Sequence, residues 1–112
     1  GDSPLLRPRG EAVELARLKL VTIVAEAVLE HRLVEEIKRL GAKGYTLVDA
    51  RGEGSRGLRT MDWEGKNIRL ETIVSEEVAF KILNRLQEAY FPHYAVVAFV
   101  ENVEVVRGEK YV

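Results

Sequence analysis

The stretch NIRLETIVSEEVAFKILNRLQEAYFPHYAVVAFV, residues 67–100, decides the fold. Its first eight residues alternate apolar and polar side chains, the pattern of a half-buried strand over 67–74. Ser75 then stands as a helix N-cap, and apolar side chains recur on one helical face until Pro92 ends the helix. A second apolar run predicts a strand over 95–106. This half of the chain therefore reads strand, helix, strand.

The preceding half of the chain shows the same order of strand, helix and strand. Residues 18–25 are rich in leucine, valine and isoleucine and predict a buried strand. Over 29–40 the apolar positions repeat every three or four residues, which indicates an amphipathic helix, and Gly41 stands where helices commonly end. Residues 45–50 predict another strand. The whole order matches the ferredoxin-like βαββαβ plan: an α+β fold with an antiparallel four-stranded sheet and two helices on one face.

The N-terminal part does not fit this plan. Residues 1–10 hold two prolines and two glycines and predict no regular element. The composition of 11–17 is typical of a short helix. We therefore expect a tail with a short helix over 1–17 and one domain over 18–112, since 112 residues are enough for a single core.

Composition excludes several classes of function. With 17 basic and 18 acidic residues the net charge is -1, so the chain has no overall attraction for nucleic acid. It contains no cysteine, which excludes disulfides and thiolate zinc sites. No apolar run reaches about 18 residues, so we expect no membrane insertion and a cytoplasmic protein.

The last strand is apolar on both of its faces. Val97 and Phe99 alternate with Ala98 and Val100, and the first strand is similarly two-sided. Two helices cover one face of a sheet, and burying each such side chain is worth about 1.5–3 kcal/mol. The second face therefore predicts a homo-oligomer that buries it.

A glycine-rich segment follows the second strand. Its glycines let backbone amides converge on an oxyanion. A serine adds a hydroxyl, and two arginines add planar cations suited to phosphate. The residues are Gly52, Gly54, Gly57, Ser55, Arg56 and Arg59. Ordinary hairpin loops share this composition, so the residues alone leave both an anion site and a plain loop open.

Other residues give weaker indications of a binding or catalytic site. Leu58, Met61 and Trp63 lie further along the same segment, where Trp63 is either a local contact or an anchor for a partner. The two histidines have no second ligand at metal spacing, so no metal site is expected. Glu35 and Glu36 are adjacent on one helix, which is typical of solvated carboxylates.

Four strings together resemble the PII-like signalling proteins: KLVTIVAEAVL, RLGAKGYTLVDARGEGSRGLRT, NIRLETIV and YFPHYAVVAFVENVEVV. The resemblance covers 19–106 and is strongest to the SbtB-like branch, which is associated with bicarbonate uptake. It implies a homotrimer with nucleotide sites in the clefts between subunits. The implied ligand is an adenine nucleotide, AMP, cAMP, ADP or ATP, with bicarbonate as a further candidate and no other cofactor.

The resemblance also implies roles for individual residues. Those carried over as the phosphate contacts are Gly54, Ser55, Arg56 and Arg59, and Gly52 is carried over as a further nucleotide-binding residue. Glu26 and Tyr94 are carried over as walls of the cleft. Leu58, Met61 and Trp63 then belong to the loop that meets a partner.

The function implied is regulatory and not enzymatic. Nucleotide binding would alter the loop, and the loop would act on a bicarbonate transporter or an enzyme of carbon metabolism. The alternatives are a slow nucleotide phosphatase, a nitrogen-regulatory PII protein and a ligand-free CutA-like structural trimer. The segment 57–66 contains no tyrosine, so the nucleotidylylation known from some nitrogen-regulatory PII proteins is not expected.

Overall fold

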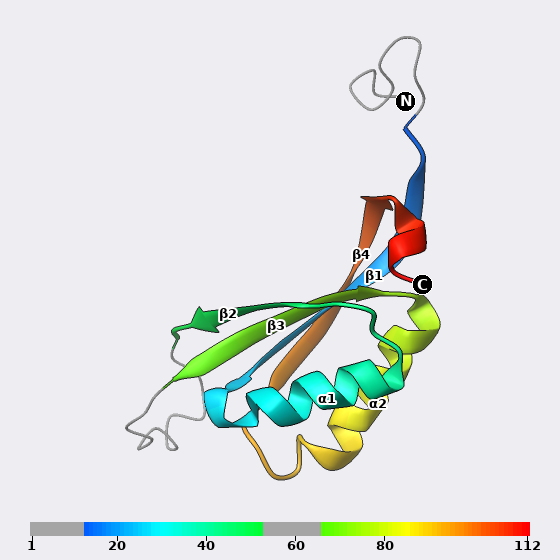
Figure 1. Ribbon diagram of the computed structural model, residues 1–112. Helices are drawn as coiled ribbons and strands as arrows, with labels where there is room; N and C mark the ends of the chain where they lie inside the picture. The colour runs from blue at the N-terminus through cyan, green and yellow to red at the C-terminus, as the bar shows by residue number, and fades with distance from the viewer. Residues whose placement is uncertain (1–12, 53–65) are drawn as a thin grey trace.

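The computed structural model describes residues 13–52 and 66–112. Its strands are β1 (Leu15–Glu26), β2 (Thr46–Ala50), β3 (Asn67–Val74) and β4 (Val97–Val106). Its helices are α1 (Glu30–Leu40) and α2 (Glu76–Ala89), with single 3₁₀ turns at η1 (Ala27–Leu29) and η3 (Gly108–Lys110). The strands form one antiparallel sheet in the order β2-β3-β1-β4, and both helices lie against the same face (Figure 1). The predicted ferredoxin-like fold is confirmed.

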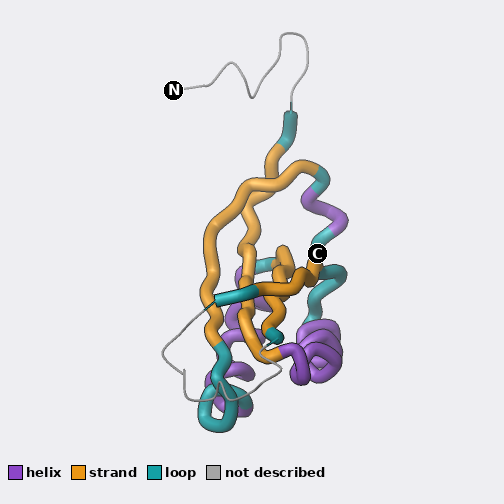
Figure 2. The backbone as a smooth tube through the Cα atoms, turned by 90° about the vertical axis from the view of Figure 1, so that its left-hand side faces the viewer, coloured by secondary structure: helices purple, strands orange, loops and turns teal. Residues whose placement is uncertain are grey.

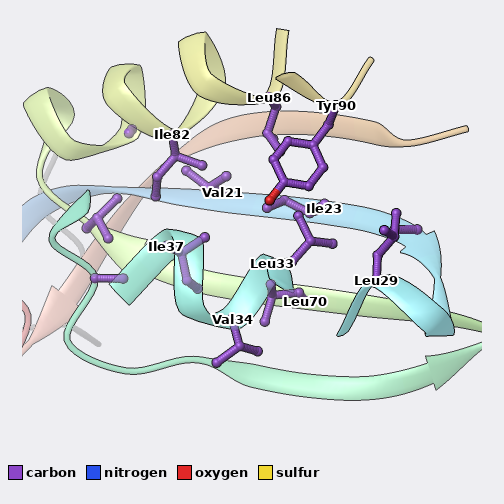
Figure 3. Close-up of a cluster of buried hydrophobic side chains, with 14 residues drawn as sticks. Val21, Ile23, Leu29, Leu33, Val34, Ile37, Leu70, Ile82, Leu86 and Tyr90 are labelled. Carbon is purple, nitrogen blue, oxygen red and sulfur yellow. The ribbon is translucent and has the colours of Figure 1, made fainter. Parts of the chain in front are cut away.

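The core lies between this sheet face and the two helices. Strand register places Ile23 of β1 beside Leu70 of β3, and both are fully buried. The helices contribute side chains at the spacing expected from the sequence, and Figure 3 shows them gathered in one cluster with Val21, Ile23 and Leu70 of the strands. The core members from α1, α2 and the residue that caps α2 are Leu33, Val34, Ile37, Ala79, Ile82, Leu86 and Tyr90. The amphipathic pattern therefore correctly predicted which side of each helix is buried.

Both helix boundaries depend on specific residues. The hydroxyl of Ser75 accepts a hydrogen bond from the backbone N–H of Val78 at 3.2 Å, so the predicted N-cap of α2 is confirmed. At the end of α1, Gly41 takes a φ of 127°. A Cβ at Gly41 would lie 2.9 Å from Cγ2 of Val78. The backbone conformation and the approach of α2 both favour glycine there.

The N-terminal expectation is partly wrong. β1 begins at Leu15, so residues 15–17 are strand and not the end of a helix. They pair with 104–106 of β4, and the two strands extend together beyond the body of the sheet (Figures 1 and 2). Ladder hydrogen bonds to β4 override a weak local helix preference, which is worth only a fraction of a kcal/mol per residue. Residues 1–12 lie outside the described ranges.

The other face of the sheet carries apolar side chains that no described element covers. Ala98 and Val100 pack against the core, so Val97 and Phe99 point to the opposite face. Val97 is 57% exposed, Phe99 47% and Val48 of β2 43%. We call these three residues the open sheet face. The two-sided apolar character of β4 was predicted, and the structure shows which set of side chains is left uncovered.

We expect Gly41→Ala to lower the free energy of unfolding by about 1–2 kcal/mol, because an alanine is strained at this positive φ. Gly44→Ala is the matched control, since a Cβ there meets nothing within 4 Å. Urea denaturation of both variants measures the difference. Equal stability of the two variants would contradict the assigned C-terminal geometry of α1.

If copies pack through the open sheet face, we expect Phe99→Asp to give a lower mass than wild type, because burying an unpaired carboxylate costs several kcal/mol. Phe80→Asp is the control, because Phe80 is 53% exposed but lies on α2, away from the open sheet face. Light scattering gives the mass of each variant. An unchanged mass for Phe99→Asp would show that the open sheet face is not an interface.

Candidate functional site

The predicted site residues fall into two groups. Gly54, Ser55, Arg56 and Arg59, with Leu58, Met61 and Trp63, lie outside the described residues. Gly52, Glu26 and Tyr94 are described, and their placement can be reported. Their assigned roles remain predictions.

Gly52 and Glu26 lie at the same end of the sheet. Ala50 of β2 pairs with Asn67 of β3, and Asn67 pairs with Glu26 at the end of β1. Gly52 follows two residues after Ala50 and is exposed, with open space where a Cβ would be. The backbone N–H of Ala27 donates to the carbonyl of Lys66 at 2.9 Å, which fixes the start of β3 beside the end of β1. The described residues on either side of 53–65, Gly52 and Lys66, therefore lie at this end of the sheet, where β2 ends and β3 begins (Figure 1).

Tyr94 reaches the same end of the sheet from the other edge. It lies in the turn between α2 and β4, and β4 starts at Val97, which pairs with Val24 near the end of β1. In the order β2-β3-β1-β4 the strands β2 and β4 are the two edges. Three inter-strand spacings separate them, which is about 14 Å. A single chain therefore does not bring Gly52 and Tyr94 together, whereas adjacent edges of two copies can.

Tyr94 is held by a residue that the sequence analysis did not identify. Nη1 of Arg32, in the first turn of α1, donates a 2.7 Å hydrogen bond to the hydroxyl of Tyr94. The Arg32 guanidinium also lies 5.3 Å from the ring centre of Tyr90 and 5.5 Å from that of Tyr94. Distances of this size allow cation–π attraction. The phenol beside it raises the pKa of Arg32, so Arg32 stays charged.

Glu36 lies one helical turn beyond Arg32, at the centre of a charged network. Its side chain is only 10% exposed, so the expectation that it is solvated is wrong. It accepts a 3.0 Å hydrogen bond from the hydroxyl of Tyr90 and another from Arg39. Nε of Arg85 lies 3.2 Å from Oε1 of Glu36, an ion pair that lacks the alignment of a hydrogen bond. The network joins α1 to α2 beside the ring of Tyr90, which Figure 3 shows reaching from the end of α2 toward Leu33.

The two acidic groups of this network have shifted pKa values. Burial raises the pKa of Glu36, but the donors from Arg39 and Tyr90 and the charge of Arg85 outweigh it, so the net pKa is below its ordinary value. Burial and the neighbouring carboxylate raise the pKa of Tyr90. At neutral pH the network therefore holds an ionised Glu36 and a protonated Tyr90 hydroxyl that donates to it. Its role is to fix structure, since a carboxylate with a low pKa is a weak base.

The sequence did contain a signal for this network. Arg32, Glu36 and Arg39 recur at i, i+4 and i+7, which places them on one stripe of α1. This stripe borders the apolar face, so its side chains were candidates for contact with α2.

The part of the chain that the structure describes contains neither a cluster of metal-binding side chains nor a helix able to span a membrane. Among the described residues no group of three or more His, Cys, Asp or Glu side chains is placed to hold a metal ion. Within 13–52 and 66–112, neither α-helix has the length and apolar character that a membrane crossing requires.

Comparison with known proteins gives consistent matches. The family model described as nitrogen regulatory protein P-II matches residues 18–110. A PII-like signalling protein from Thermus thermophilus is 79% identical, with a TM-score of 0.78, over 88% of this chain and 99% of that chain. CPII from Thiomonas intermedia, solved with ADP and bicarbonate bound, is 30% identical, with a TM-score of 0.79, over 90% of this chain and 100% of that chain. The same protein solved with ADP, AMP and bicarbonate gives 28% identity and a TM-score of 0.77, over 89% and 98%. The resemblance drawn from the sequence is confirmed.

We expect Glu36→Gln to lower the free energy of unfolding by about 1.5–3 kcal/mol at neutral pH, the usual worth of hydrogen bonds to a charged group. Because the folded pKa of Glu36 is lowered, this contribution is present above the ordinary carboxyl pKa and is lost as the pH falls through the folded value. The difference between wild type and variant should therefore shrink below about pH 4.

Glu35→Gln is the control for this prediction, because Glu35 is exposed on the same helix. Its effect should stay within about 0.5 kcal/mol at every pH. Urea denaturation across a pH series makes the measurement. A Glu36→Gln effect that is constant with pH would contradict the ionised state assigned to Glu36.

Proposed function

The chain belongs to the nitrogen regulatory protein P-II family, and we propose that it is a homotrimeric regulator that binds adenine nucleotides in the clefts between subunits. The observation that carries this proposal is the Thiomonas relative, which was solved with ADP and bicarbonate bound. The similarity between the two proteins extends over nearly the whole of both chains, and on this ground we infer that they bind the nucleotide in the same way. Bicarbonate is proposed as a further ligand on the same ground.

The placement of the candidate residues supports a site between subunits. At one end of the sheet Gly52 follows the edge strand β2, Tyr94 precedes the opposite edge strand β4, and Glu26 ends the inner strand β1 between them. Packing of copies through the open sheet face would set the β2 edge of one subunit beside the β4 edge of the next. Such an arrangement would combine the glycine-rich segment of one copy with the α2–β4 turn of its neighbour.

The phosphate end of the nucleotide is assigned to the glycine-rich segment. Gly54, Ser55, Arg56 and Arg59 supply amides, a hydroxyl and two guanidiniums, the groups that bind phosphate in other proteins. Gly52 would let the backbone approach the ligand closely. This assignment rests on the sequence, because these residues other than Gly52 lie outside the described ranges.

We further propose that the protein regulates and does not catalyse. Nucleotide binding would change the segment that contains Leu58, Met61 and Trp63, and this segment would contact a partner. A bicarbonate transporter or an enzyme of inorganic carbon metabolism is the partner class that fits a regulator responding to adenine nucleotide and bicarbonate together.

We expect calorimetry to show that wild type binds ADP and AMP more tightly than adenosine, which lacks phosphate. Arg56→Ala should weaken ADP binding by about 1.5–3 kcal/mol, the range for a hydrogen bond to a charged group, and should leave adenosine binding unchanged. Arg51→Ala is the matched control, since Arg51 is an exposed arginine just before the segment.

Two results would contradict the proposal. If wild type binds ADP no better than adenosine, the glycine-rich segment is a plain loop. If phosphate is released steadily from ADP or ATP, the protein is a nucleotide phosphatase. A phosphate-release assay run beside the calorimetry separates these outcomes.

A further inference from the structure

The turn between α2 and β4 is closed by its own backbone. The N–H groups of His93 and Tyr94 both donate to the carbonyl of Tyr90, at 2.9 and 2.8 Å. The N–H of Val96 then donates to the carbonyl of Tyr94 at 3.0 Å. These bonds give the turn a defined internal shape. They do not by themselves fix where the turn sits relative to the helices.

Two side chains on one stripe of α1 fix that position. Glu36 accepts from the hydroxyl of Tyr90, which is the start of the turn, and this contact is mostly buried. Arg32 donates to the hydroxyl of Tyr94, four residues further on, and this contact is exposed. Arg32 and Glu36 are spaced i, i+4, so they lie one above the other on the helix and hold the two ends of the turn.

The two contacts differ in how firmly they hold. Tyr90 is 1% exposed and packs in the core, so the start of the turn cannot move without disrupting it. Tyr94 is only half-buried, and its ring lies 6.0 Å from that of Tyr90 and 6.3 Å from that of His93. Arg32 meets Tyr94 in two ways, through the hydrogen bond and through the face of the ring. The ring of Tyr94 also packs against the edge of the core, and Arg32 holds its exposed hydroxyl end.

We propose that Arg32 is a positioning residue for nucleotide binding, and that it acts through Tyr94. The inference rests on the proposed function, in which the α2–β4 turn forms one wall of the intersubunit cleft. Arg32 does not touch the ligand. It sets the distance of Tyr94 from α1, and thereby the width of the cleft that the neighbouring subunit completes.

The guanidinium is suited to this role. It is planar, so it can lie against an aromatic face while one of its N–H groups points at the phenol oxygen. A glutamine at 32 keeps a hydrogen-bond donor but loses the charge and the stacking plane. Tyr94→Phe keeps the ring and every charge, and removes only the hydroxyl. The two variants therefore separate loss of the contact from loss of a positive charge near an anionic ligand.

The test measures ADP binding by calorimetry for wild type, Arg32→Gln, Tyr94→Phe and the double variant. We expect each single variant to raise the Kd for ADP by about threefold to tenfold. The double variant should be no weaker than the weaker single variant, because both changes remove the same contact. Lys38→Gln is the control: it removes the same charge from α1 six residues away, about 9 Å along the helix, and should bind as wild type.

A second readout does not use ligand. Amide hydrogen exchange at His93 and Tyr94 should be faster in Arg32→Gln and Tyr94→Phe than in wild type, whereas exchange in the core strands should not change. A variant that lowers the stability of the whole fold would speed exchange in the core strands as well.

The outcomes are distinguishable. Wild-type affinity in Arg32→Gln and Tyr94→Phe would overturn the inference and leave the proposed function intact. Independent, additive losses in the double variant would also overturn it, because they would mean that Arg32 acts on the nucleotide by its charge. Absence of ADP binding by wild type would overturn the proposed function, and the inference with it.

Discussion

Two helices cover one face of a four-stranded sheet, and this one-sided burial is the constraint on which the rest of the structure depends. The helix-facing residues of β1 and β3 are close to fully buried, so the single chain already has a complete core. On the opposite face Val48, Val97 and Phe99 remain about half exposed. Covering such an apolar face lowers the free energy of the protein, and a second copy carries the matching surface. In the proposed function, assembly and the position of the nucleotide site would both follow from this sheet.

The strand order determines which candidate residues can meet within one chain. Because β2 and β4 are the outer strands, the residues at the end of each cannot meet within one chain. Gly52, where the glycine-rich segment begins, and the α2–β4 turn are nevertheless at the same end of the sheet. An arrangement that closes the open sheet face would also bring these two edges together from different subunits. Arg32 and Glu36 of α1 bind the hydroxyls of Tyr94 and Tyr90, so α1 holds this turn in place.

The fold was largely predictable from the sequence. The alternation of apolar side chains in 67–74 and the N-cap at Ser75 are local signals, and local signals gave correct elements. The N-terminal strand is the exception, because residues 15–17 become strand only through pairing with the distant β4. Glu36 and Arg32 were missed for a related reason. The spacing of Arg32, Glu36 and Arg39 marks them as candidates for contact with a second helix, but whether each is solvated or buried depends on how α2 packs.

The central claim is that the nucleotide site is formed between subunits, and native mass spectrometry with ADP tests it most directly. Spectra recorded across a dilution series report the mass and the bound ligand of each species in the same experiment. If the site lies between subunits, trimers carry up to one ADP per subunit and monomers formed on dilution carry none. ADP bound to monomers with the same occupancy as to trimers would contradict it, because a single chain would then contain the whole site.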